Sequence, residues 1–248
     1  MRFSALIFGV LASVALSTQT AQAQYHYKVR HYNSQGRPYY RGPVQLTLGG
    51  GTALYNGDLG NSPGNNFFSP AFSLGLRYRL SPHWHIGAEG TYAKLGARDQ
   101  LKERGFAFTT TSGVGTAMLR YDLIADQSVF AASIADAPIF QVYVQAGAGL
   151  ILFDPKVYLG TERATDNTAY LPAERNDYPA LSGVLPVGGG IGVRLTDLLT
   201  AGVEANYYFS TTDHLDGVHA RLGGASASND GFGTLMLRLD FSLANLAL

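Results

Sequence analysis

The sequence predicts an all-β protein, an eight-stranded antiparallel up-and-down transmembrane β-barrel of the outer-membrane type. Three observations lead to this fold class. Segments of roughly ten residues place apolar side chains at every second position, as expected of strands with one apolar face. Long polar connections alternate with shorter ones, which is typical of outer-membrane barrels. The first residues have the features of a cleavable export signal.

The segment 71–80 shows the alternation most clearly. Phe72, Leu74 and Leu76 share one face with two further apolar residues, and Arg77 and Arg79 lie on the opposite face. In a soluble sandwich the arginines would meet water, and the apolar face would pack on a second sheet. In a membrane barrel the apolar face would meet lipid, and the arginines would point into the lumen.

Eight segments are predicted as strands, each justified by the residues that alternate on its apolar face. In chain order they are 44–54 (Leu46, Leu48, Leu54), 71–80 (described above), 84–95 (Trp84, Ile86, Ala88, Tyr92), 106–123 (Ala117, Leu119, Tyr121, Leu123), 140–152 (Val142, Val144, Ala146, Ala148, Leu150), 184–195 (Val187, Ile191, Val193, Leu195), 201–209 (Ala201, Val203, Ala205, Tyr207, Phe209) and 231–241 (Leu235, Leu237, Leu239, Phe241). An even number of strands closes such a sheet.

The connections between these segments fall into two groups. Those after the second and sixth strands, Ser81 to His83 and Thr196 to Leu198, are short. Those after the first, third, fifth and seventh strands are long and polar, namely 55–70, 96–105, 153–183 and 210–230. The link 124–139 is longer than others on its side, and we expect a helical turn in it. This sorting favours the barrel over the sandwich and predicts long loops outside the cell, with both termini in the periplasm.

The chain divides into three predicted parts. Residues 1–23 form a signal peptide, with Arg2 before the apolar run 6–16 and cleavage after Ala23. Residues 24–43 form a periplasmic N-terminal segment in which Tyr alternates with Lys and Arg. This segment is either a flexible tail or a docking segment for a periplasmic partner. Residues 44–248 form the outer-membrane barrel. The chain has no cysteine, so it offers neither a lipoprotein anchor nor a disulfide framework.

Composition narrows the function classes. Only 15% of the residues are charged, which is below the roughly 25% of typical soluble domains. The 18 basic and 18 acidic residues balance, so the chain as a whole has no general attraction to nucleic acid or to anionic lipid. The expected partner is outer-membrane lipid, and the expected location is the bacterial outer membrane as an integral protein.

The predicted inward face collects ionisable side chains. They are Arg77, Arg79, Glu89, Arg120, Asp122, Arg194, Glu204, Arg238 and Asp240. The lumen of an eight-stranded barrel is only wide enough for side chains to fill it. We therefore predict a structural network of paired charges, because an unpaired buried ion is costly. A narrow conducting pore is the alternative.

No catalytic, cofactor-binding or metal site is predicted. The six histidines lack the spacing of a closed zinc site, and polar surface is the expected place for them. The group Asp213, His214 and Asp216 would need Ser210 or Ser226 as a nucleophile to make a lipid-modifying enzyme. The triplets Gly49–Gly51 and Gly188–Gly190 lie within strands and precede no Lys-Ser/Thr or helix, so they are not phosphate loops.

Four stretches resemble one known family. They are Tyr55–Leu59, Pro70–Phe72 with Tyr78–Leu80, Phe153–Lys156 and Thr211–Val218. In this order they are similar to the Bacteroidetes outer-membrane β-barrel family that includes PorG, a component of the type IX secretion machinery. The resemblance implies an eight-stranded barrel without catalytic residues or cofactor, and an association with periplasmic secretion-ring proteins. It supplies no set of functional residues.

The predicted function is therefore that of a non-enzymatic outer-membrane protein, a structural or anchoring component of type IX secretion. A small adhesin or ligand-binding barrel that works through its external loops, and a narrow pore, remain alternatives.

Overall fold

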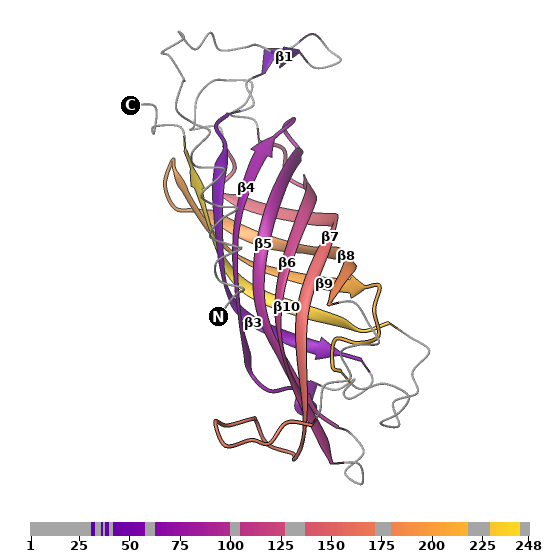
Figure 1. Ribbon diagram of the computed structural model, residues 1–248. Helices are drawn as coiled ribbons and strands as arrows, with labels where there is room; N and C mark the ends of the chain where they lie inside the picture. Colours follow the sequence, from indigo (N-terminus) through magenta and orange to yellow (C-terminus); the bar gives the residue numbers. More distant parts are fainter. Residues whose placement is uncertain are drawn as a thin grey trace, which may run out of the picture.

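The protein folds into a closed antiparallel barrel of eight strands in the computed structural model (Figure 1). The structure describes residues 31–32, 36, 38–39, 42–57, 63–99, 105–126, 137–171, 180–217 and 229–243. The order around the barrel is β10-β3-β4-β5-β6-β7-β8-β9, so each strand pairs with its neighbour in sequence and the last closes on the first. The predicted fold class is confirmed.

The strands follow the predicted segments closely. Their bounds are β3 (Gln45–Asn56), β4 (Ser69–Arg79), β5 (Trp84–Arg98), β6 (Phe106–Asp122), β7 (Phe140–Leu159), β8 (Leu181–Arg194), β9 (Leu199–Ser210) and β10 (Gly231–Ser242). A short 3-10 helix, η1 (Pro63–Asn65), lies between β3 and β4, and two strands of two residues each, β1 (His31–Tyr32) and β2 (Pro38–Tyr39), pair with each other.

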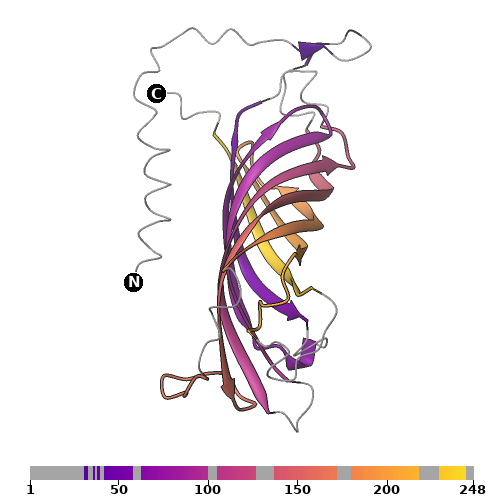
Figure 2. The same ribbon diagram turned by 45° about the vertical axis from the view of Figure 1, so that its right-hand side comes forward.

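The largest difference from the prediction concerns β7. The sequence placed 153–156 in a loop, whereas β7 continues to Leu159 because β6 pairs with it over its whole length, from Asp122↔Tyr143 to Phe106↔Leu159. Beyond Leu152 the other edge of β7 is no longer paired with β8. Pro155 is tolerated there, since a proline that cannot donate to a ladder belongs on an edge. Consequently β5, β6 and β7 together reach beyond the other strands (Figure 2).

The two ends of the barrel differ. One end carries the short turns 80–83 and 195–198, the start of β3 and the end of β10; we call it the turn end. The other carries the long connections; we call it the loop end. The expected helical turn between β6 and β7 falls largely in 127–136, outside the described residues. The same holds for the signal peptide and for most of the N-terminal segment 24–43.

The strands are staggered around the barrel. Following the paired residues from strand to strand, the path returns to β3 displaced by about ten residues, which with eight strands corresponds to a tilt of about 40°. In a barrel of this size side chains fill the interior. Among the described residues no helix is long and apolar enough to span a membrane.

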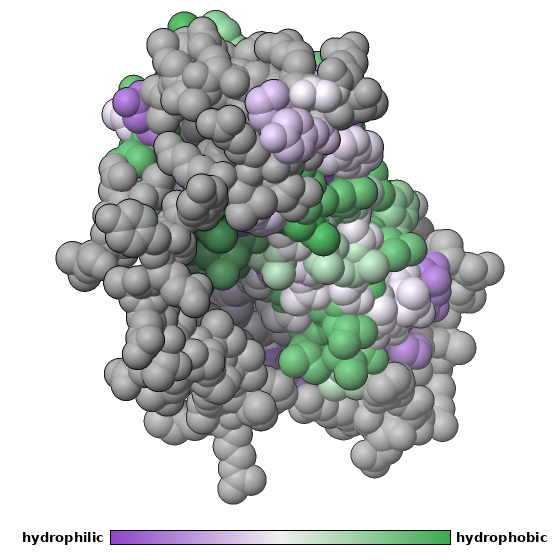
Figure 3. Space-filling view, turned by 90° about the horizontal axis from the view of Figure 1, so that it is seen from above, coloured by the Kyte–Doolittle hydropathy of each residue, from purple (hydrophilic) through white to green (hydrophobic). Residues whose placement is uncertain are grey.

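The outer wall of the barrel is apolar. Outward side chains are exposed on every strand, for example Leu74, Leu119, Val144, Ile191 and Leu237. Aromatic residues lie near both limits of this band: Trp84 and Phe140 toward the turn end, Phe72, Tyr92 and Phe209 toward the loop end. Figure 3, viewed from the turn end, shows apolar side chains on the part of the wall not covered by grey atoms.

The height of this band matches a bilayer. From Trp84 to Lys94, β5 runs about ten residues, which at about 3.3 Å per residue and a tilt of about 40° spans about 25 Å along the axis. An outer-membrane barrel presents an apolar band of about 25 Å.

The interior has two layers. Toward the loop end, apolar residues form a core cluster that includes Leu95, Phe108, Ile151, Tyr208, Leu215 and Phe232. Toward the turn end, charged and polar side chains fill the lumen. Apolar material therefore lies on both sides of the wall near the loop end, and ions lie inside near the turn end.

Candidate functional site: a charged lumen beneath a capped mouth

The nine ionisable residues singled out in the sequence all lie on the inner side of the strands or at its turn-end rim. Arg77, Arg120, Asp122, Glu204, Arg238 and Asp240 are buried, whereas Arg79, Glu89 and Arg194 are partly buried. The side-chain alternation of each strand places them there.

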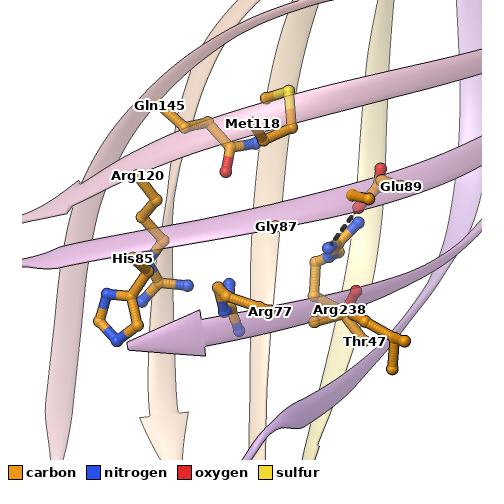
Figure 4. Close-up of a pocket in the computed structure, with 11 residues that line it drawn as sticks. Thr47, Arg77, His85, Gly87, Glu89, Met118, Arg120, Gln145 and Arg238 are labelled. Carbon is orange, nitrogen blue, oxygen red and sulfur yellow. Dashed lines mark ion pairs between the residues drawn. The ribbon is translucent and has the colours of Figure 1, made fainter. Parts of the chain in front are cut away.

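Arg238 is the centre of the first ion cluster. Its Nη2 lies 2.7 Å from Glu89 Oε2 (Figure 4). Its Nη1 lies 3.4 Å from Glu204 Oε1. Nη1 also donates to Ser73 Oγ at 2.9 Å. Glu204, only 1% exposed, accepts a further hydrogen bond from the Tyr143 hydroxyl at 2.7 Å. One guanidinium thus serves two carboxylates contributed by other strands.

Side-chain amides connect the Glu204 carboxylate to the wall of the lumen. Asn206 Nδ2 donates to Glu204 Oε1 at 2.8 Å, and Gln145 Nε2 donates to Asn206 Oδ1 at 2.8 Å. This chain connects β9 to β7 across β8. Both oxygens of Glu204 are therefore hydrogen-bonded, as a buried carboxylate requires.

A second ion cluster lies closer to the turn end. Arg77 Nη2 lies 2.5 Å from Asp240 Oδ2, and Arg120 Nε lies 2.5 Å from Asp122 Oδ1. The Arg120 guanidinium also lies 3.5 Å from the centroid of the Tyr143 ring. Tyr143 therefore touches both clusters, through its hydroxyl in one and its ring face in the other.

His85 corrects the expectation that the histidines lie on polar surface. It is 2% exposed and sits in the lumen, with Nδ1 3.6 Å from Asp122 Oδ2. Arg79 Nε donates to His85 Nε2 at 3.3 Å, and Arg79 Nη2 forms an ion pair of 2.7 Å with Asp126. The sequence missed Asp126 because it follows β6 and so lies outside the strand pattern. Arg194 Nη2 donates a hydrogen bond to the Ala137 carbonyl oxygen at 2.7 Å.

A small pocket lies among these residues. Figure 4 shows the Arg77, Arg120 and Arg238 side chains around it, together with His85 and Glu89. Each of the three arginines has at least one carboxylate partner, so the pocket carries no large excess of positive charge. In the described part of the chain no group of three His, Asp or Glu residues is placed to hold a metal ion. The arrangement stabilises charges inside the barrel.

The segment 211–217, between β9 and β10, closes the mouth of the barrel at the loop end; we call it the cap. Leu215 is fully buried in the apolar core. Its carbonyl accepts from Thr110 Oγ1 at 2.6 Å, and its amide donates to Asp230 Oδ2 at 2.9 Å. The Tyr55 hydroxyl lies 2.8 Å from Asp216 Oδ2 and 2.6 Å from Asp230 Oδ1. The cap is thus anchored to β3, β6 and the start of β10.

Three of the stretches that carry the family resemblance meet at this cap. Tyr55 belongs to the first, and Pro155 to the third. Gly217, in the last, has a φ of +71°, and a Cβ there would meet Pro155 Cβ at 3.0 Å. A Cβ on Gly57 would overlap the Tyr55 hydroxyl and the Asp230 carboxylate. These short motifs, far apart in sequence, therefore form one structural unit.

Two members of the possible nucleophile set, Ser210 and Asp216, bind groups of the cap and its neighbours. The Ser210 hydroxyl lies 2.9 Å from the Thr212 carbonyl oxygen and 2.7 Å from that of Asp230. Asp216 accepts from Tyr55. Both groups hold the cap in place, which is a structural role. Ser226, the other candidate, lies outside the described residues.

Comparisons with known proteins give only distant likenesses. No protein-family model matches the chain, and no curated protein matches it. Among solved structures, Neisserial surface protein A is 14% identical with a TM-score of 0.43 and covers 80% of this chain and 96% of its own. Ail of Yersinia pestis, solved with the heparin analogue sucrose octasulfate, is 13% identical with a TM-score of 0.43 and covers 81% and 98%. A major outer membrane protein from Thermus thermophilus is 10% identical with a TM-score of 0.44 and covers 80% and 98%. At identities and TM-scores this low, the likenesses carry no conclusion about this chain.

Proposed function

We propose that the protein is a non-enzymatic, integral outer-membrane barrel whose role is structural. The observation that carries the proposal is the pairing of an apolar outer band about 25 Å high with a lumen filled by paired ions and closed by the cap. Lipid is the solvent that suits exposed leucine, isoleucine or valine side chains on each of the eight strands. A barrel with a packed interior can serve as a rigid anchor in the membrane.

Folding into bilayers tests the membrane location. The chain should convert from an unfolded state in urea to a heat-modifiable, protease-resistant form in phosphatidylcholine vesicles. Trp84, the only tryptophan, lies at the turn-end limit of the band, so its fluorescence should shift to the blue on insertion. A chain that stays soluble and does not associate with vesicles would contradict the proposal.

The narrow pore is disfavoured by the same interior. Arg238, Glu89 and Glu204 bridge the lumen, and Leu215 closes the core layer above them. The intact barrel should therefore show no single-channel conductance in planar bilayers. Steady conductance of the folded protein would overturn the sealed-lumen interpretation.

We further propose that this anchor belongs to a type IX secretion machinery. The support is the family resemblance, three of whose stretches meet at the cap and so share a structural reason to occur together. The partner would be periplasmic secretion-ring proteins, docked at the turn end and on the N-terminal segment 24–43. Affinity purification from outer membranes tests this, with a tag in the exposed hairpin 160–169. Ring proteins should accompany the full chain and be lost when 24–41 are removed. Their absence from the full-length sample would contradict the assignment.

An adhesin or ligand-binding role is the second candidate, favoured by one observation. β6 and β7 extend beyond the apolar band and carry the exposed hairpin 160–169 into solvent. Replacing 161–168 by a short Gly-Ser linker should leave secretion intact if the barrel is an anchor. Loss of cell or matrix attachment with secretion unchanged would favour the adhesin.

A further inference from the structure

We propose that the outward face of β5 and β7, just beyond the apolar band at the loop end, binds a membrane lipid whose headgroup carries more than one phosphate. The inference rests on the proposed membrane location, because the site exists only if the band lies in a bilayer.

The outward face of both strands changes from apolar to cationic at the edge of the band. On β5, Tyr92 is the last exposed apolar side chain, and Lys94 and Arg98 follow on the same face. On β7, Leu152 is the last, and Lys156 follows. All three cations are exposed. Their charges therefore lie at the level that lipid headgroups occupy.

The lysines and arginines that do not line the lumen gather on one side of the barrel at the loop end. Of the lysines and arginines that the structure describes, those on the inner side of the barrel and its turn-end rim are Arg77, Arg79, Arg120, Arg194 and Arg238. The others are Lys94, Arg98, Lys156 and Arg163, and all four belong to β5, β7 or the hairpin that follows β7. Such sorting gives one side of the barrel rim a cationic surface.

The register sets the spacing of the three strand cations. Lys156 lies opposite Thr109, and Thr109 lies opposite Gly96, which is midway between Lys94 and Arg98 on β5. With strands about 4.8 Å apart and residues about 3.3 Å apart, the Lys156 Cα lies about 12 Å from each of the other two. Long side chains can close this distance onto one headgroup, but a single phosphate is too small to meet all three. Two phosphates on one headgroup fit this spacing.

Neighbouring contacts hold the surface in shape. Arg98 Nη2 donates to the Gly64 carbonyl oxygen at 3.2 Å, which fixes the segment before β4 beside β5. Arg163 Nη1 donates to the Phe68 carbonyl oxygen at 2.9 Å, and the Phe68 side chain is 74% exposed. Phe68 follows η1 and precedes β4, so an exposed aromatic ring stands beside the cations. An amphiphile with acyl chains below and phosphates above suits this combination.

On the outward face of β5 and β7 beyond the band, the three cations stand beside one acid, Asp154. Asp154 lies in the same row as Lys94 and Thr111, but it is only partly exposed and has interactions of its own. Glu162 and Asp166 are exposed in the hairpin beyond β7. Lys156 Nζ lies 5.7 Å from the centroid of the Tyr170 ring, an arrangement that leaves the ammonium free to bind an oxyanion.

Lipid selection by the full chain in nanodiscs tests the proposal. The discs contain phosphatidylcholine with either cardiolipin, which carries two phosphates, or phosphatidylglycerol at equal total charge. The lipids that stay bound after mild detergent release are counted by native mass spectrometry. We expect the wild-type chain to retain cardiolipin in preference to phosphatidylglycerol. The triple variant K94Q/R98Q/K156Q should need a higher cardiolipin fraction for half occupancy, by about fivefold for each cation removed.

The charge-preserving variant K94R/R98K/K156R is the matched control and should keep the preference. Heat-modifiable folding in pure phosphatidylcholine is measured first for every variant. A wild-type chain that does not fold there contradicts the membrane location itself. A wild-type chain that folds but retains both anionic lipids equally, or a triple variant that retains cardiolipin as the wild type does, overturns the lipid site and leaves the barrel proposal standing.

Discussion

Removing both carboxylates that hold Arg238 should destabilise the barrel by more than the two single changes together. Arg238 is 5% exposed and is bound by Glu89 at 2.7 Å and by Glu204 at 3.4 Å. In either single variant, Glu89→Gln or Glu204→Gln, one carboxylate remains. Each should therefore cost about the difference between a charged hydrogen bond and one to a neutral amide, roughly 1 kcal/mol.

The double variant leaves the guanidinium without an acid in direct contact. Only the Ser73 hydroxyl, at 2.9 Å from Nη1, still accepts a bond from it among the partners described above. An uncompensated buried charge costs about 3–5 kcal/mol beyond the loss of neutral contacts. We therefore expect a coupling energy of at least about 1 kcal/mol between the two sites. Glutamine keeps the shape of glutamate, so cavity formation does not confuse the result. At position 204 its oxygen can still accept from Asn206, whereas its amide nitrogen would have to donate to the Tyr143 hydroxyl instead of accepting from it.

Equilibrium unfolding in urea from phosphatidylcholine vesicles measures these free energies, followed by Trp84 fluorescence and by heat-modifiable gel mobility. Asp197→Asn, in the exposed turn between β8 and β9, is the control and should change stability by less than about 0.5 kcal/mol. A double variant that costs no more than the two single variants together would refute the reasoning. The lumen would then have to be hydrated, and the expected absence of conductance would lose its explanation.

Three further outcomes follow from the fold. Leu76→Arg, on the lipid face, should cost about 2–4 kcal/mol in folding into vesicles, whereas Thr111→Arg, exposed beyond the band, should cost less than about 0.5 kcal/mol; equal costs would contradict the face assignment. A cysteine introduced at Asp166 should be labelled on intact cells and one in the turn 81–83 should not, and labelling at the turn alone would reverse the orientation. Leu215→Ala should destabilise the barrel by about 2–5 kcal/mol in the same urea assay, because the side chain is fully buried; an unchanged midpoint would mean that the cap is not packed as described.

The strands could be predicted from the sequence because the alternation of apolar and polar side chains is a local property. A strand such as β4 reveals both of its faces within eleven residues, and the closed order of strands then follows from their succession. The length of β7 could not be predicted, because Asp154 and Pro155 are typical turn residues. Only the pairing partner, the long β6, shows that the strand continues beyond the last residue that pairs with β8.

Which side chains point into the barrel could be predicted from the alternation along each strand. The contacts that they make with residues far away in the sequence could not. Alternation put His85 on the inner face, yet its residue type suggested surface. The cap depends on Tyr55 meeting Asp216, residues 161 positions apart, and no local pattern reports such a contact. Gly75 shows the same limit: it lies on the inner face, but a Cβ there would meet the Ala88 carbonyl oxygen at 2.8 Å. An inward position is therefore not necessarily a tolerant one.

Because of the cap, the long connections at the loop end differ in how well they tolerate an inserted foreign peptide. The hairpin between β7 and β8 is exposed at Asp166 and Asn167, so an epitope inserted between them extends into solvent without disturbing the barrel wall. An epitope inserted next to Leu215 would instead pull a buried side chain out of the core. In the proposed orientation the hairpin suits surface display on intact bacteria, whereas residues 211–217 have to be left as they are.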